Sequence, residues 1–264
     1  MPATGRPAAA DALAGWLGDP RRAALLTDFD GTLAPIVVDP EAAVPLPAAL
    51  PVLADLTGSL GVVAVVSGRP VRFLRQRLAG VADRLVLVGL YGLEWAEQGA
   101  VRSHPEAEPW RPAVAAAVRD ASWAAPGGVT VEDKGLAVTI HARRSPHRYP
   151  WVEEFGAATA ERLGLAAHPG RLSMELRPPV AVDKGTVVAS LSEGMAAACY
   201  IGDDRGDLPA FAALDRRRAT GMATLAVAAS SDEAPPELLG AADLVVDGPE
   251  GTLALLATLA ELAG

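Results

Sequence analysis

Short apolar runs alternate with helix-length segments along this chain, and this alternation constrains the fold more than any other feature. Six runs have the length and composition of buried strands: Ala23 to Thr27, Gly61 to Val66, Arg84 to Val88, Ala197 to Ile201, Leu225 to Ala228 and Asp243 to Val246. Between several of them lie expected helices: Leu46 to Ser59, Val71 to Ala79, Lys184 to Glu193 and Leu208 to Leu214. We therefore expect an α/β fold with a doubly wound parallel sheet, covered by helices on both faces.

The middle of the chain follows a different pattern. Its expected helices are Trp110 to Trp123 and Tyr149 to Leu163, and its expected strands are Val129 to Val131, Leu136 to His141 and Arg171 to Leu176. This mixture predicts an inserted α+β cap domain at residues 100–175, within a core made of residues 1–99 and 176–264. We expect the Ala-rich N-terminal stretch to be a helix.

Composition excludes several classes of protein. The chain has 264 residues, of which 50% are hydrophobic, so it can bury a substantial core. Its single cysteine, Cys199, excludes an intramolecular disulfide and favours a reducing, cytoplasmic setting. We find neither an export signal nor an apolar stretch long enough to span a membrane. The net charge of -9 disfavours nucleic acid as a partner, and we expect a monomer.

Two aspartates follow the first expected strand. Asp28 and Asp30 lie where ligands gather in a parallel sheet, at the carboxyl ends of the strands. Their side chains should project to the same side, and Gly31 permits a backbone path that other residues resist. Neighbouring carboxylates repel unless a cation, a held proton or water offsets their charge. A divalent metal with a phosphate meets this condition, and the competing interpretation is a pair of turn-forming residues.

Three further segments have the composition of a phosphate and metal site. Ser67 and Gly68 follow the second expected strand and could hold phosphate oxygens, although Ser-Gly is also common in ordinary turns. Lys184 opens an expected helix, where the helix dipole disfavours a cation unless an anion is near; a solvated lysine is the other interpretation. Tyr200 to Asp207 carries three acids around two glycines, and carboxylate oxygens are the ligands that Mg²⁺ takes.

Taken in order, these segments resemble the haloacid dehalogenase (HAD) superfamily. Its signature is Asp-x-Asp-x-Thr, then a Ser or Thr, a Lys and an acidic motif. The matching residues are Asp28 to Thr32, Ser67, Lys184 and Gly202 to Asp207. The resemblance implies a HAD/Rossmann-like core with an inserted cap, and phosphoryl transfer that depends on Mg²⁺.

The resemblance also implies a role for each catalytic residue. Asp28 would attack phosphorus and form an aspartyl-phosphate, while Asp30 would protonate the sugar oxygen and later activate water. We expect Asp30 to start protonated, because a neighbouring carboxylate and partial burial both favour the neutral acid. Ser67 and Lys184 would complete the cradle for the phosphate, and Lys184 would restrain the nucleophile.

The same resemblance implies the ligands of the metal and of the phosphate. The metal-binding residues would be Asp28, Asp30 through its backbone carbonyl, and Asp203, with Asp204 or Asp207 acting through water or outer contacts. The core residues assigned to substrate binding are Thr32, Gly68 and Arg69.

Five longer blocks resemble trehalose-6-phosphate phosphatases in the same order: DFDGTLAPI, VSGR, GLYGLEW, VEDKGLAVTIHARR and ELRPPVAVDKG. The resemblance implies that the cap residues holding the sugar hydroxyls are Glu132, Lys134, Arg143 and Glu175. Carboxylates accept hydrogen bonds from hydroxyls and ammonium groups donate to them, so these residue types suit the task. For Glu132 and Lys134 the other interpretation is a solvated pair on a strand edge.

The remaining large or titratable residues of the middle segment have a structural interpretation. The tryptophans that we expect to pack, with sugar stacking as the other interpretation, are Trp95, Trp110, Trp123 and Trp151. We expect His104 and His141 to be structural, because no histidines stand at metal-binding spacing.

Two positions depart from the family pattern, which usually has histidine in place of Tyr91 and threonine in place of Gly206. We expect these departures to affect the placement of the metal loop and of the sugar. The expected function is hydrolysis of trehalose 6-phosphate to trehalose and phosphate, with a functional link to the trehalose-phosphate synthase. Two alternatives stand: a phosphatase of sucrose or mannosyl phosphate, and a catalytically silent sensor of a sugar phosphate.

Overall fold

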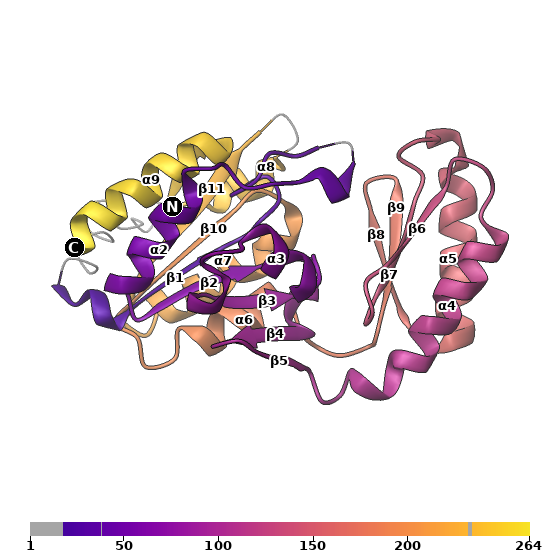
Figure 1. Ribbon diagram of the computed structural model, residues 1–264, viewed down its shortest axis with the longest axis horizontal. Helices are drawn as coiled ribbons and strands as arrows, with labels where there is room; N and C mark the ends of the chain where they lie inside the picture. Colours follow the sequence, from indigo (N-terminus) through magenta and orange to yellow (C-terminus); the bar gives the residue numbers. More distant parts are fainter. Residues whose placement is uncertain (1–17, 38, 232–233) are drawn as a thin grey trace, which may run out of the picture. The chain divides into compact units, whose positions relative to one another are not determined.

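An eight-stranded sheet forms the core of the computed structural model, which describes residues 18–37, 39–231 and 234–264. Its strands, in order across the sheet, are β12 (Leu244–Asp247), β11 (Ala223–Ser230), β10 (Ala197–Gly202), β1 (Ala23–Thr27), β2 (Val62–Val66), β3 (Val86–Gly89), β4 (Glu94–Glu97) and β5 (Ala100–Ser103) (Figure 1). The first six are parallel to one another, which confirms the predicted doubly wound sheet. The expected N-terminal helix lies outside the described residues.

The strand order reverses at the centre of the sheet, between β1 and β10. From β1 the chain builds outward through β2 and β3, then returns to pair β10 with the other side of β1. In the register of these strands Thr27 lies between Ile201 and Val65. The residues that follow the three strands therefore leave the sheet side by side, at the kind of crevice where doubly wound folds bind ligands.

Helices cover both faces of this sheet. One apolar cluster contains alternate strand residues such as Leu25 and is covered by α2 (Ala49–Ser59), α3 (Val71–Arg77) and α9 (Gly248–Ala263). The other contains Leu26 and is covered by α6 (Lys184–Leu191), α7 (Leu208–Arg218) and α8 (Pro236–Ala241). Every residue of β1 is consequently buried, which explains why this strand is a continuous apolar run rather than an alternating one.

The outer edge of the sheet carries two strands that were not predicted from the sequence. Strand β4 pairs with β3 in the antiparallel direction, and β5 follows beside it. Glu94 and Glu97 lie in β4, and Ala100, Val101 and Arg102 are exposed in β5. An edge strand buries little apolar surface, so its sequence lacks the apolar run by which the central strands are recognised.

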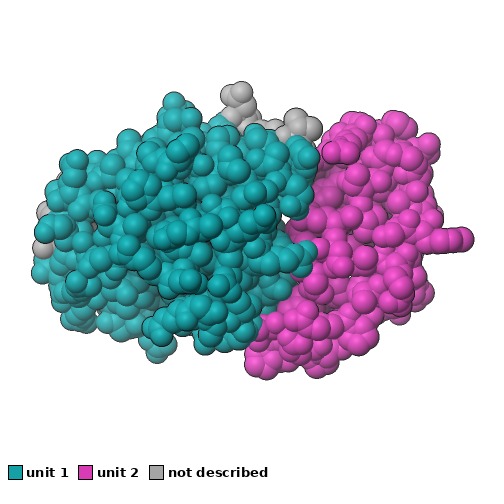
Figure 2. Space-filling model, viewed as in Figure 1, with its two compact units in different colours: residues 1–102, 182–264 teal, residues 103–181 magenta. Residues whose placement is uncertain are grey.

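The chain divides into two compact units (Figure 2). The first comprises Met1–Arg102 and Val182–Gly264, and the second comprises Ser103–Ala181. The sheet of the second unit is antiparallel, in the order β6 (Thr130–Asp133), β7 (Val138–His141), β9 (Ser173–Arg177) and β8 (Ala166–Gly170). Because β9 pairs with both β7 and β8, the second unit ends after this strand, whereas the expected cap boundary at residue 175 would cut through it.

The sheet of the second unit has one apolar and one polar face. Val138 and Ile140 of β7 lie in a hydrophobic cluster with α4 (Arg111–Ala124) and α5 (Tyr149–Leu163). Thr139 and His141 alternate with them and so project to the opposite face. Charged side chains of β6 and β9 share that face, which makes it the candidate binding surface of this unit.

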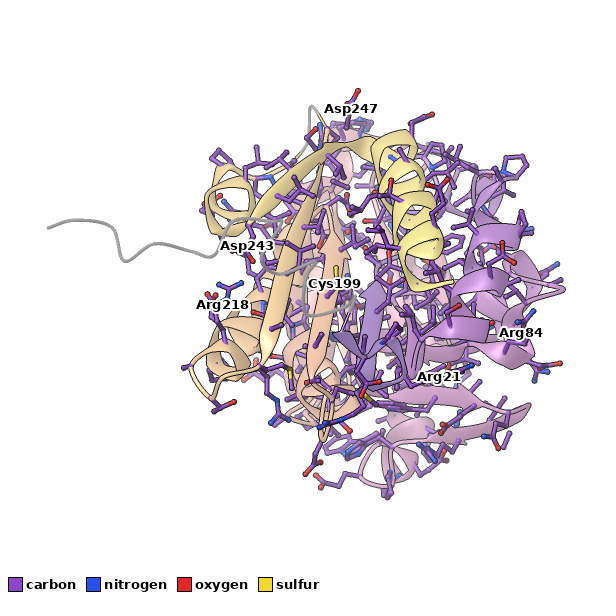
Figure 3. All side chains as sticks on the ribbon, turned by 90° about the vertical axis from the view of Figure 1, so that its left-hand side faces the viewer. Arg21, Arg84, Cys199, Arg218, Asp243 and Asp247 are labelled. Atoms are coloured by element: carbon purple, nitrogen blue, oxygen red, sulfur yellow. The ribbon has the colours of Figure 1, made fainter. Side chains whose placement is uncertain are left out.

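Cys199 is buried in β10, among the apolar residues that α9 covers (Figure 3). Burial is the main reason why the pKa of its thiol is raised far above the ordinary value, so this cysteine is a packing residue. In the part of the chain that the structure describes, no helix is both long enough and apolar enough to cross a membrane.

Candidate active site

Asp28 leaves the carboxyl end of β1 and is held there by the sheet itself. Its backbone N–H donates to the carbonyl oxygen of Ile201 at 2.8 Å, so the ladder between β1 and β10 extends one residue beyond the strand. Gly31 then turns the chain with a φ of +74°, in the left-handed region that favours glycine. A Cβ on Gly31 would lie 2.0 Å from Oδ2 of Asp203. Glycine is therefore required twice: by its φ and by the approach of Asp203.

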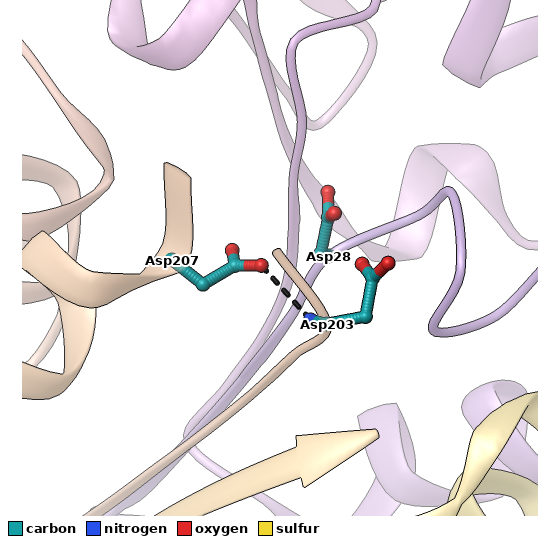
Figure 4. A group of neighbouring side chains, drawn as sticks. All are labelled: Asp28, Asp203 and Asp207. Carbon is teal, nitrogen blue, oxygen red and sulfur yellow. Dashed lines mark hydrogen bonds between the residues drawn. The ribbon is translucent and has the colours of Figure 1, made fainter. Parts of the chain in front are cut away.

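Three buried carboxylates converge at this point (Figure 4). One oxygen each of Asp28, Asp203 and Asp207 lies within 4.8 Å of the other two. Burial raises the pKa of Asp28 well above its ordinary value, although Lys184 opposes the rise. Burial, then the charges of Asp207 and Asp204, raises the pKa of Asp203 to about 8. So much negative charge in so little space disfavours ionisation unless a cation joins the group.

The donor set of this cluster fits a divalent cation. Oδ1 of Asp28 is buried and receives no hydrogen bond, which leaves an acceptor available for a metal. Its closest cation is Lys184, whose Nζ lies 3.1 Å away as an ion pair without hydrogen-bond geometry. Carboxylate oxygens are the ligands that Mg²⁺ prefers, so Asp28 and Asp203 are the residues best suited to hold it.

Asp207 differs from its two neighbours because its oxygens already accept four hydrogen bonds. Oδ1 accepts from Nζ of Lys184 and from the hydroxyl of Tyr200, both at 2.6 Å. Oδ2 accepts from the backbone N–H groups of Asp203 and Asp204, at 2.9 and 3.0 Å. A carboxylate has about four acceptor sites, so Asp207 fixes the loop and the lysine rather than offering free oxygens to a metal.

Lys184 is 2% exposed, so the interpretation of a solvated lysine is wrong. It is the first residue of α6, behind Asp183, whose side chain caps the helix by accepting from the N–H of Thr186. Burial disfavours the charged ammonium, but the carboxylates of Asp207 and Asp28 outweigh burial and raise the pKa of Lys184 well above its ordinary value. A permanent cation therefore lies between the candidate nucleophile and the acidic loop.

Tyr200 is a residue of this network that the sequence reasoning missed. Its side chain is fully buried in the face of β10 that packs against α7, where its ring contacts Phe211 edge to face. Burial, followed by the charge of Asp207, raises the pKa of its hydroxyl well above the ordinary value. A buried tyrosine needs a partner for its hydroxyl, and this requirement is the signal that could have indicated the contact.

Asp30 lies in the same loop as Asp28 but contacts a different cation. The guanidinium of Arg69 donates to both of its oxygens, at 2.7 and 2.9 Å, and stacks on Phe73 with 4.6 Å between Cζ and the ring centre. The backbone N–H of Arg69 also donates to Oγ of buried Ser67, at 3.2 Å. Sequence reasoning expected a proton on Asp30, whereas this two-pronged pairing suits an ionised carboxylate.

The other predicted core residues are Thr32, Gly68 and Asp204. Thr32 is buried and its hydroxyl donates to Oδ1 of Asp203 at 3.4 Å. Gly68 lies against Tyr91, because a Cβ on Gly68 would come within 2.6 Å of the phenolic oxygen. Asp204 is exposed, and its Oδ1 accepts from the N–H of Gly206 at 2.8 Å. The structure thus uses Asp204 to shape the loop and does not bring it into the triad.

In the second unit, three of the four predicted cap residues meet on the polar face of the sheet. Nζ of Lys134 lies 2.8 Å from Oε1 of Glu175 and 4.0 Å from Oε2 of Glu132. The side chains of Glu132 and Lys134 are 20% and 10% exposed, so the interpretation of a solvated pair is wrong for these two residues. Arg143, in contrast, is exposed after the end of β7.

The expectation for the tryptophans is right for three of the four. The three that pack against hydrophobic clusters are Trp95, Trp110 and Trp151. Trp123 is 91% exposed, so the packing prediction is wrong there. The buried residues of α4 are Val114, Ala117 and Ala121, and Trp123 lies outside this helical repeat, so it does not belong to the buried face.

Comparisons with known proteins identify the family of this chain. The sequence model of the trehalose-phosphatase family matches residues 26–237. A trehalose-phosphate phosphatase of Mycobacterium marinum is 34% identical over 205 residues, covering 73% of this chain and 52% of the relative. The chain thus spans about half the length of that relative. A probable trehalose-phosphate phosphatase of Sinorhizobium fredii is also 34% identical, over 73% of this chain and 74% of its own length.

A solved structure supports the same fold. A protein described as related to trehalose-6-phosphate phosphatase superposes with a TM-score of 0.77, over 90% of this chain and 98% of its own, at 23% identity. At this identity the likeness is one of fold. The match of the family model to most of the chain, together with the Sinorhizobium relative, assigns the sequence: the chain belongs to the trehalose-phosphatase family.

Proposed function

We propose that this chain hydrolyses trehalose 6-phosphate to trehalose and phosphate, with Mg²⁺ and through an aspartyl-phosphate on Asp28. The observation that carries the proposal is the environment of Asp28. Its carboxylate is buried at the strand-order reversal, 3.1 Å from Lys184, with an oxygen that receives no hydrogen bond. A carboxylate is suited to attack phosphorus when it is desolvated, aligned by a cation and accepts few hydrogen bonds.

The surrounding residues supply the other requirements of phosphoryl transfer. Lys184 would neutralise phosphate oxygens, and the hydroxyl of Ser67 and the N–H of Gly68 would donate to them. Thr32 would orient Asp203 through its hydroxyl. Arg69 would pass from the carboxylate of Asp30 to the incoming phosphate, since both are anions within reach of the Ser67 turn. Asp30, once released from Arg69, would take up a proton from solvent, give it to the sugar oxygen as that oxygen leaves, and then take a proton from the attacking water.

The metal would be held by the carboxylates of Asp28 and Asp203 and by the backbone carbonyl of Asp30, with Asp207 fixed behind them and Asp204 outside. When bound, Mg²⁺ offsets negative charge on the phosphate oxygens and on these carboxylates. We therefore place Asp207 outside the ligands of the metal, because protein donors already fill its acceptor sites.

The sugar would be selected by the polar face of the second unit. Glu132, Lys134 and Glu175 combine acceptors and a donor in one cluster, as recognition of several hydroxyls requires. We assign Arg143 to the same task. The names of the relatives support a trehalose phosphate as the substrate, and we extend the proposal to a cytoplasmic reaction that consumes the product of a trehalose-phosphate synthase.

A phosphate-release assay tests this proposal. The panel contains trehalose 6-phosphate, sucrose phosphate and a mannosyl phosphate, each with Mg²⁺ and with a chelator. We expect release from trehalose 6-phosphate that requires Mg²⁺. Release from another sugar only would favour the alternative substrates, and no release from any of them would favour the sensor.

The nucleophile has its own test in Asp28→Asn. We expect this variant to stay folded and to lose at least about a thousandfold in kcat, because the covalent step has no other nucleophile. Trapping of radiolabelled phosphate on the unmodified chain, but not on Asp28→Asn, would locate the intermediate. Activity above about one hundredth of the original would exclude Asp28 as the nucleophile.

A further inference from the structure

His141 lies on the polar face of the second sheet, beside the residues assigned to the sugar. In the register of the four strands, Glu132, Thr139 and Glu175 stand directly opposite one another across β6, β7 and β9. His141 is two residues further along β7, so its ring projects to the same face. The side chain of His141 is 13% exposed, and it is thus mostly enclosed by that surface.

The ring makes one short contact, and that contact is with Glu132. Nε2 of His141 lies 3.0 Å from Oε2 of Glu132. An ionised carboxylate only accepts, so Nε2 carries the hydrogen and donates it. The other nitrogen, Nδ1, is buried and has no hydrogen-bond partner. An apolar side chain would serve packing alone without burying a nitrogen that has no partner. The hydrogen bond to Glu132 is therefore what favours histidine over an apolar residue at this position.

The two carboxylates of this face are held by different partners. Lys134 lies 2.8 Å from Glu175 but 4.0 Å from Glu132, and the hydroxyl of Thr139 donates to Glu175 at 3.2 Å. Glu175 thus has Lys134, Thr139 and, at 3.7 Å, Nε of Arg177, while His141 makes the short contact with Glu132. Strand β6 lies at the edge of the sheet, beside β7. The side chain of β7 that contacts Glu132 is His141.

We propose that His141 is a positioning residue that orients the carboxylate of Glu132 toward the hydroxyls of the sugar. This inference rests on the proposed function. A carboxylate that is already oriented loses less side-chain freedom when it accepts hydrogen bonds from a ligand, so binding is tighter. His141 therefore sets the affinity for a polyhydroxylated substrate without touching the phosphate, and its earlier interpretation as a structural residue is replaced.

Two amide substitutions of His141 separate this role from a structural one. His141→Gln keeps an N–H donor near the position of Nε2, whereas the amide of His141→Asn is one carbon too short to reach Glu132. We expect His141→Asn to raise KM for trehalose 6-phosphate about tenfold or more, as loss of a hydrogen bond to a charged group implies, with kcat changed less than about twofold. His141→Gln should restore KM to within about threefold of the original.

Three measurements complete the test. Hydrolysis of 4-nitrophenyl phosphate, which has no sugar hydroxyls, reports whether each variant retains a working catalytic unit. His104→Asn places the same substitution in a turn, where Nδ1 of His104 accepts from the N–H of Glu106 at 3.3 Å, and it should leave KM unchanged. In a Glu132→Ala background, His141→Asn should have no further effect on KM, because the residue acts through Glu132.

The outcomes distinguish this inference from the proposed function. If the unmodified chain releases no phosphate from trehalose 6-phosphate, both are overturned. If it does release phosphate, three results overturn the role of His141 alone: an unchanged KM in His141→Asn, an equal loss of activity toward both substrates, or no rescue by His141→Gln.

Discussion

The carboxylate of Asp207 is the most heavily used acceptor in the site, and Tyr200 is the one donor to it that can be removed by deleting a single atom. Tyr200→Phe keeps the ring among its apolar neighbours and removes a hydrogen bond to a charged, buried group. We expect the free energy of unfolding to fall by about 1–3 kcal/mol. We also expect kcat to fall about tenfold, because Asp207 would hold Lys184 and the Asp203 loop less firmly.

Urea denaturation and steady-state kinetics measure these two effects. Tyr149→Phe, at the start of α5, is the matched control and should leave kcat unchanged. If Tyr200→Phe also left kcat unchanged, the three remaining donors would be sufficient to hold Asp207.

Asp203 makes the stability of the metal-free protein depend on pH. An unfolded aspartate titrates near pH ~4, whereas the folded environment raises the pKa of Asp203 to about 8. Between these values the folded state holds the extra proton, so the stability that this proton contributes is present at low pH and lost as pH rises through about 8. Binding of a cation in place of this proton is therefore favoured as pH rises.

The increase in melting temperature caused by Mg²⁺ should therefore grow from about pH 6 to about pH 8.5. Thermal melts at constant ionic strength, with Mg²⁺ or with a chelator, measure it. Asp203→Asn removes this titrating group and should weaken the pH dependence, leaving the part that Asp28 contributes through its own raised pKa. A magnesium effect of constant size across the range would contradict Asp203 as a ligand.

Residue patterns predicted which residues gather at the acidic cluster better than they predicted the side chains that hold them. Asp28, Lys184 and Asp203 follow strands or open helices at positions where a ligand is expected, so their spacing identifies them. Tyr200 lies inside an apolar strand, and its partner Asp207 is seven residues away across a turn. The pairing of Arg69 with Asp30 depends on two loops whose paths the sequence does not specify.

Among the elements, the buried pair of Arg218 and Asp243 joins α7 to the entry of β12 (Figure 3). Oδ2 of Asp243 accepts from Nη2 of Arg218 and from the N–H of Ala226 in β11. The side chain of Asp243 is 2% exposed and that of Arg218 is 20% exposed. This carboxylate therefore links a helix to two strands from within the protein, where an unpaired charge is costly.

Arg218→Met tests this connection. We expect the variant to lose about 3 kcal/mol of unfolding free energy, because it leaves a buried carboxylate without its cation. Arg205→Met breaks the exposed pair of Arg205 and Glu237 and should cost about 1 kcal/mol or less. Urea denaturation of the two variants measures the difference. Equal losses would contradict a special role for the buried pair.

For β1, α5 and β8, the strength of the apolar pattern determined whether the element was predicted. Strand β1 and helix α5 have the predicted bounds, since a buried run and a helical repeat are both strong signals. Strand β8 was missed because its sequence, Ala-Ala-His-Pro-Gly, is largely exposed and contains proline. Helix α9 was also missed, although Leu256 and Leu259 recur at helical spacing and are buried.

At the scale of the whole molecule, the two units have separate hydrophobic cores. Every residue of the cluster that contains Ile140 lies within Ser103–Ala181, and every residue of the clusters that contain Leu25 and Leu26 lies in the first unit. Since burial of apolar surface is the main source of cooperativity, each core can stabilise its own unit.

Two matched truncations test whether the units unfold separately. Ile140→Ala and Leu25→Ala each empty a fully buried site and should cost about 3 kcal/mol in the unit that contains it. For Ile140→Ala, we expect amide exchange in β7 and β9 to speed up by about a hundredfold while β1 and β10 keep their protection. Leu25→Ala should give the opposite pattern. Native-state hydrogen exchange read by mass spectrometry resolves these strands. If either truncation sped up exchange equally in both units, the chain would unfold as one body, and substitutions in the sheet of the second unit would also change the stability of the acidic cluster in the first.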